Sequence, residues 1–73
     1  MYRMMVFSTF THDTVWQRIL KCDSFIEAKF LTITELKQAL GAEDISLYEL
    51  PDSKYKICMD GIYAGQVKIR KVS

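Results

Sequence analysis

The residues of this sequence that could perform covalent chemistry are few and widely separated. The one histidine, His12, stands beside Asp13, and the two cysteines, Cys22 and Cys58, are 36 positions apart. A histidine beside an aspartate can indicate a general base for a cysteine nucleophile, but adjacent side chains point apart and no glycine-rich turn accompanies them. We therefore expect no catalytic residue and interpret His12 as a polar loop residue.

The same residues do not form a recognisable metal or cofactor site. One histidine and two distant cysteines lack the spacing of a tetrahedral metal site. The three glycines, Gly41, Gly61 and Gly65, are too far apart to form a phosphate-binding loop. The sequence thus predicts a protein that is not an enzyme, holds no metal or cofactor, and functions by binding.

Length and composition limit how such a binding protein can fold. The chain has 73 residues, of which 49% are apolar and 26% are charged, so we expect a single domain over residues 1–73. No apolar run approaches the ~20 residues of a membrane span, and no signal peptide is visible. We therefore expect a cytoplasmic protein with reduced thiols and no membrane partner. A core of this size supplies only about 3–5 kcal/mol of net stability, so association into a homo-oligomer is the most available further source of stability.

The net charge of +1 does not by itself indicate a polyanionic partner, but the charges are unevenly distributed. Residues 43–52 contain four carboxylates and no basic residue, whereas residues 54–71 contain five cations and only one carboxylate, Asp60. This asymmetry indicates either a charged binding face or ion pairs between neighbouring strands.

Hydrophobic periodicity predicts the elements that must position these residues. The segment Tyr2–Phe10 is partly apolar on both of its alternating faces, which indicates an interior strand. Residues 13–22 have the spacing of one apolar helix face, and Asp13 is a suitable N-cap. The sequence therefore predicts a strand followed by a helix in its first third.

Two further segments favour helix. In residues 24–31, Ser24 and Glu27 have the spacing of a capping box, although the apolar residues also alternate as in a strand. Residues 33–40 follow a second capping-box pair, Thr32 and Glu35. Gly41 then ends this helix as a left-handed C-cap.

The C-terminal third is typical of antiparallel sheet. A β-prone run, Ile45–Leu50, precedes two strands, 54–60 and 62–72, that flank the hairpin turn Asp60-Gly61. A regular hairpin would bury Lys68 and other polar residues, so we predict a bulge at Gly65. The bulge turns the apolar residues of the last strand toward the core and gathers the cations on the opposite face: Lys54, Lys56, Lys68 and Arg70.

Together these elements predict an α+β fold. It has an N-terminal strand, two or three short helices on one face of the sheet, and a C-terminal three-stranded antiparallel meander.

One segment also resembles the helix-turn-helix of MerR-type regulators and excisionases. The resemblance lies in Leu31-Thr32-Ile33-Thr34-Glu35-Leu36, followed by Gly41 and Ser46-Leu47, with the C-terminal hairpin as a wing. It implies DNA binding through a recognition helix over residues 44–50. That segment contains two carboxylates and no cation, whereas a helix in the major groove needs donors and cations. Its β-prone composition favours a strand instead.

The favoured function is that of a small non-catalytic intracellular protein-interaction module: an adaptor, an inhibitor or an accessory subunit. In a domain this small some aromatic and methionine side chains remain exposed, and these residue types are enriched in interface cores. The candidate interaction residues are Met5, Phe7, Trp16, Tyr48 and Tyr63. Trp16 is the most ambiguous of them, because it flanks the predicted core stripe of its helix.

The alternative function is nucleic-acid binding through the basic face of the C-terminal hairpin. Its cations can neutralise phosphates, and an exposed tyrosine can stack on a base. The candidate residues are Lys54, Lys56, Tyr63, Lys68 and Arg70.

Overall fold

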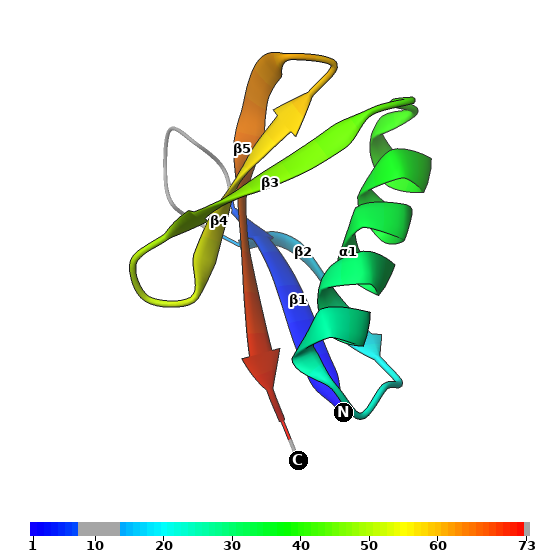
Figure 1. Ribbon diagram of the computed structural model, residues 1–73, viewed down its shortest axis with the longest axis vertical. Helices are drawn as coiled ribbons and strands as arrows, with labels where there is room; N and C mark the ends of the chain where they lie inside the picture. The colour runs from blue at the N-terminus through cyan, green and yellow to red at the C-terminus, as the bar shows by residue number, and fades with distance from the viewer. Residues whose placement is uncertain (8–13, 73) are drawn as a thin grey trace.

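The computed structural model describes residues 1–7 and 14–72 of the chain (Figure 1). The elements in chain order are β1 (Tyr2–Phe7), β2 (Thr14–Leu20), α1 (Phe25–Leu40), β3 (Ile45–Leu50), β4 (Lys54–Met59) and β5 (Ile62–Lys71). The five strands form one antiparallel sheet in the order β2-β1-β5-β4-β3. The helix α1 lies on one face of this sheet (Figure 1).

The helix α1 is one continuous element of 16 residues. The Ser24 hydroxyl accepts a hydrogen bond from the backbone N–H of Glu27 at 3.2 Å, and Gly41 ends the helix with φ at 65°. Both caps are confirmed as predicted. Thr32 does not start a second helix, because its buried hydroxyl donates to the Ala28 carbonyl at 2.8 Å within the same helix.

Within residues 13–22, which we expected to form a helix, the structure has a strand over Thr14–Leu20. This strand, β2, pairs with β1 and places Trp16 opposite Val6. Trp16 lies on the face that α1 covers, whereas Ile19 lies on the other face and is 49% exposed. Residues with branched and aromatic side chains favour a strand, and here pairing with β1 outweighed the helical spacing. The proposed cap Asp13, like His12, lies outside the described residues.

The predicted fold class is therefore wrong in both its helices and its sheet. The described residues form one helix rather than two or three, and the three C-terminal strands belong to a five-stranded sheet rather than to a separate meander. The molecule is mostly sheet, so the α+β description fits only loosely. The resemblance to a helix-turn-helix is also not realised, because residues 45–50 form a strand.

The β4–β5 hairpin contains the predicted bulge at Gly65. Its φ angle is 143°, in a region that favours glycine, and the register of the two strands shifts beside it. The shift places Val67 opposite Tyr55 on the covered face. Lys68 and Arg70 consequently lie on the face away from α1.

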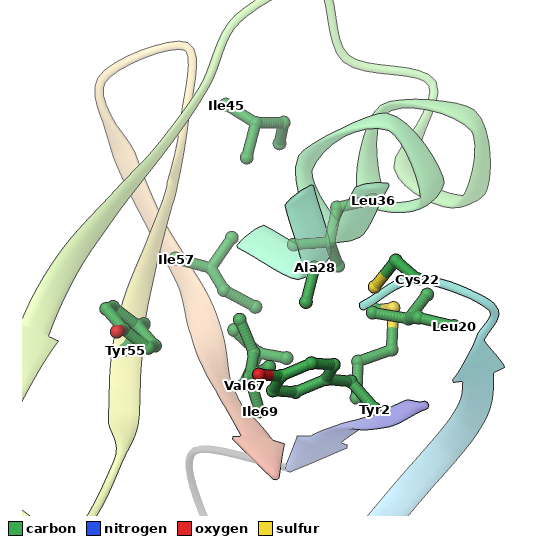
Figure 2. Packing of buried hydrophobic residues seen from close by; sticks show 11 residues of the cluster. Tyr2, Leu20, Cys22, Ala28, Leu36, Ile45, Tyr55, Ile57, Val67 and Ile69 are labelled. Atoms are coloured by element: carbon green, nitrogen blue, oxygen red, sulfur yellow. The ribbon is translucent and has the colours of Figure 1, made fainter. Parts of the chain in front are cut away.

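The core lies between α1 and the covered face of the sheet. Figure 2 shows Ala28 and Leu36 of the helix pointing toward Ile57 and Val67 of the central strands. These residues are at most 1% exposed. The helix therefore attaches through a narrow stripe of small and medium-sized side chains.

An aromatic cluster closes the core at the start of α1. The Phe25 ring lies 6.3 Å from the Tyr2 ring and 6.2 Å from the Tyr55 ring, measured between centroids. Burial and, to a smaller extent, the charge of Glu49 raise the pKa of Tyr55. The neutral phenol is therefore favoured in the fold, and this contribution is lost as the pH rises through the raised pKa.

Replacing Gly65 with alanine should destabilise the fold by at least about 1 kcal/mol, because an L-residue is strained at this φ angle. The measurement is chemical denaturation. Lys71, exposed on the same strand and outside the bulge, supplies the control, since Lys71→Ala should change the free energy of unfolding by less than about 0.5 kcal/mol. Equal stability of Gly65→Ala and the unmodified protein would contradict the bulge.

Candidate functional site

The face of the sheet that α1 does not cover collects most of the residues singled out in the sequence. Side chains alternate along a strand, so the strand register determines which of them share this face. We call it the open face. Its described residues are Arg3, Met5 and Phe7 of β1, Gln17 and Ile19 of β2, Ser46, Tyr48 and Leu50 of β3, Lys54, Lys56 and Cys58 of β4, and Tyr63, Gln66, Lys68 and Arg70 of β5.

The side chains of the open face form rows across the sheet. One row runs from Tyr48 through Lys56 and Gln66 to Phe7. On one side of this row, Tyr63 lies nearer the β4–β5 turn. The aromatic side chains therefore gather at the turn end of the open face and along the first row.

The cations gather on the other side of the same row. Lys54 lies directly opposite Lys68, and Arg70 lies directly opposite Arg3. Like charges in directly opposite positions of an antiparallel pair destabilise the sheet. No described residue of the open face is a carboxylate. The ion pair of Arg18 with Glu35, at 3.3 Å, lies on the other side and joins β2 to α1. This cationic cluster does not stabilise the fold, because its members repel one another. A cluster of this kind is suited to binding an anionic ligand.

Cations and aromatic rings are also in contact on the open face. The Lys56 Nζ atom lies 5.5 Å from the Tyr48 ring centroid and 5.9 Å from the Tyr63 ring centroid. The Lys54 Nζ atom lies 5.8 Å from the Phe7 ring centroid. Tyr48 and Tyr63 nevertheless remain 54% and 46% exposed, so both keep ring surface available to a ligand.

A hydrogen bond holds one of these rings in place. The side-chain amide of Gln66 donates to the Tyr63 hydroxyl at 3.3 Å. This bond links the turn end of the open face to the central row, and it leaves the ring of Tyr63 on the surface.

The structure brings together the two sets of residues that the sequence offered as alternatives. All the nucleic-acid candidates, Lys54, Lys56, Tyr63, Lys68 and Arg70, lie on the open face, as do the interaction candidates Met5, Phe7 and Tyr48. Trp16 is not among them, because it lies on the covered face, packs against the core and has the Arg18 guanidinium 5.8 Å from its ring.

The sequence analysis did not predict two features of the surface. Arg3 joins the cations of the hairpin only because β1 pairs with β5, and its alternation with Met5 and Phe7 was the available signal. Ile26 and Phe30 are exposed on α1, which the spacing of Ala28 and Leu36 could have indicated.

Other groups that could support chemistry are not brought together. Cys22 is buried and Cys58 is partly exposed on the open face, and both are free thiols. Within residues 1–7 and 14–72, no three acidic, cysteine or histidine residues are placed to hold a metal ion. Over the same ranges, no helix combines the length and the apolar character that crossing a membrane requires.

No family model, curated protein or solved structure matches this chain. The functional assignment therefore depends on the chemistry of the open face.

Replacing Lys68 with glutamate should raise the free energy of unfolding by about 0.2–1 kcal/mol, since an attractive pair with Lys54 replaces a repulsive one. Added salt should stabilise the unmodified protein by screening the repulsion and should stabilise the variant less. Thermal and urea denaturation at two salt concentrations measure both effects. The control is Lys71→Glu, because Lys71 lies on the same strand but opposite Tyr2 of the covered face. A less stable Lys68→Glu variant would argue against the repulsion.

Proposed function

We propose that this protein binds single-stranded nucleic acid on its open face. The observation that carries the proposal is the pair of like-charge contacts, Lys54 with Lys68 and Arg3 with Arg70, on a face without a described carboxylate. Phosphates would relieve this repulsion and release counterions as they bind. The exposed rings beside the cations supply surfaces on which bases can stack.

The composition of the open face favours nucleic acid over a protein partner. Interface cores between proteins are depleted in lysine and other charged residues. Here Lys56 and Lys68 lie on β4 and β5, which are two of the three interior strands of the sheet. The expectation of a protein-interaction module stays a prediction, and an acidic protein surface is the competing occupant of this face.

The dimensions of the sheet favour a single strand over a duplex. With strands about 4.8 Å apart, a five-stranded sheet is about 19 Å wide, whereas the major groove of B-DNA is about 12 Å wide. Stacking on Tyr48 and Tyr63 also requires bases that are not already paired and stacked with their neighbours. The open face, with separate exposed rings, meets this requirement.

The number of cations limits the strength of binding. The open face offers five: Arg3, Lys54, Lys56, Lys68 and Arg70. If each neutralises one phosphate, the slope of log affinity against log salt is about −3.5 for a single strand. Binding should therefore be weak near physiological salt and much tighter at low salt.

The cationic part of the site is tested by fluorescence anisotropy with a labelled 12-nucleotide oligothymidylate at several salt concentrations. Lys54→Ala and Lys68→Ala should each weaken binding and make the salt slope less steep by about 0.7. The matched controls are Lys71→Ala on the same sheet and Lys37→Ala on α1, which leave the open face unchanged. Absence of binding at 50 mM salt, or equal losses in the controls, would refute the proposal.

The aromatic part of the site is tested with Tyr48→Ala and Tyr63→Ala. Each should weaken oligonucleotide binding by about 1–3 kcal/mol while the salt slope stays the same, because stacking involves no counterion release. Polyglutamate serves as the competing anion. If polyglutamate binds as tightly as the oligonucleotide and neither tyrosine matters, the open face is an acidic-protein surface instead.

A further inference from the structure

The aromatic rings and the cations occupy two adjoining parts of the open face. Tyr48 and Phe7 lie in one row, and Tyr63 lies in the next row toward the β4–β5 turn. We call this part the ring side. The two rows farther from the turn are called the cation side, and its basic residues are Lys54, Lys68, Arg3 and Arg70.

Each of these two parts extends across the sheet rather than along one strand. The rings come from β3, β5 and β1, and the cations of the cation side come from β4, β5 and β1. These four strands are consecutive in the sheet. The rings and the cations therefore form two bands that run side by side, perpendicular to the strands, in rows about 7 Å apart.

Lysine side chains connect the two bands. The Lys54 Nζ atom lies 5.8 Å from the Phe7 ring centroid, and the Lys56 Nζ atom lies 5.5 Å from the Tyr48 centroid and 5.9 Å from the Tyr63 centroid. Each ring therefore has an ammonium group beside it. Because a nucleotide carries both a base and a phosphate, a ring beside a cation can hold both groups of one nucleotide.

The direction of a bound strand follows from this arrangement. A nucleic-acid strand aligned with β5 would pass over the rings with one end and over the cations with the other, so few of its nucleotides would gain both contacts. A strand that crosses the β-strands meets a ring and a cation together at successive steps. Crossing therefore gives each nucleotide more contacts.

Building on the function proposed above, we propose that the bound single strand crosses the sheet from β3 to β1, with its bases on the ring side and its phosphates on the cation side. The substrate class is an unpaired stretch of at least three nucleotides, whose bases stack in order on Tyr48, Tyr63 and Phe7. The outer two rings are three strand spacings apart, about 14 Å. Two steps of an extended single strand span this distance.

The direction is tested by nuclear magnetic resonance on the isotope-labelled protein, with a tetrathymidylate that carries a nitroxide spin label at one end. A label on one end should broaden the amide signals of β3 most, and a label on the other end should broaden those of β1 and β2. If instead one label broadens the β4–β5 turn and the other broadens the opposite end of that hairpin, the strand is aligned with β5 and the proposal is wrong. Equal broadening of both sheet edges by either label would also overturn it.

The three-base requirement is tested by competition between oligonucleotides with equal numbers of phosphates. Trithymidylate should bind at least about fivefold more tightly than the same trinucleotide with one terminal base removed, because one ring then loses its base. In Phe7→Leu the difference should disappear, since only two rings remain, and Tyr48→Leu at the other outer ring should behave alike. Ile19→Ala is the matched control and should keep the difference, because Ile19 lies on the open face of β2, beyond the rings.

The outcomes separate this proposal from the function on which it rests. If no oligonucleotide binds at low salt, the function and the direction both fail. If oligonucleotides bind but the fivefold difference is absent, or persists in both Phe7→Leu and Tyr48→Leu, the function stands and the three-base site is refuted. The amide spectrum of each variant shows whether it is folded.

Discussion

The pairing of β1 with β5 is the constraint on which the rest of the structure depends. It joins the β1–β2 pair to the β3–β4–β5 unit and places both of its strands in the interior of the sheet. Met4 lies opposite Ile69 on the covered side, where both are buried in the core. Arg3 lies opposite Arg70 on the other side. One strand pair therefore builds the centre of the core and the centre of the cationic cluster together.

In the part of the chain that the structure describes, a single helix lies on the five-stranded sheet and covers only one of its faces. With side chains a helix is about 10–12 Å across, so α1 cannot shield even the full width of the face on which it lies. The core concentrates beneath the helix, where Leu36 and Ala28 meet Ile57 and Val67 (Figure 2). The other face holds aromatic residues and cations but no described carboxylate, and this combination distinguishes it from an ordinary solvated surface.

The features that could be predicted from the sequence are those that depend on residues close together in the chain. The caps Ser24 and Gly41 and the bulge at Gly65 follow from backbone requirements within a few residues. With the bulge in place, simple alternation put the hairpin cations on one face. The strand β2 was missed because the spacing of Trp16 and Ile19 fits a helix as well as an edge strand, and only pairing with β1 decides between them. For the same reason the sequence could not predict that the protein-interaction candidates and the nucleic-acid candidates share one face. Phe7 lies beside Gln66 only because β1 pairs with β5.

The closeness of residues 1 and 72 has a consequence for folding kinetics. The Val72 N–H donates to the Met1 carbonyl at 2.9 Å, so strands from opposite ends of this sequence finish side by side. Even the nearest partners of the β1–β5 pair, Phe7 and Gln66, are 59 positions apart, and the entropy of closing that loop must be lost before the contacts form. A circular permutant that joins these two positions and opens the chain between α1 and β3, at residues 41–44, converts the β1–β5 pair into a hairpin and leaves the β3–β4 hairpin intact. The permuted chain keeps the same open face and the same helix, and its sheet assembles from contacts that are close in sequence.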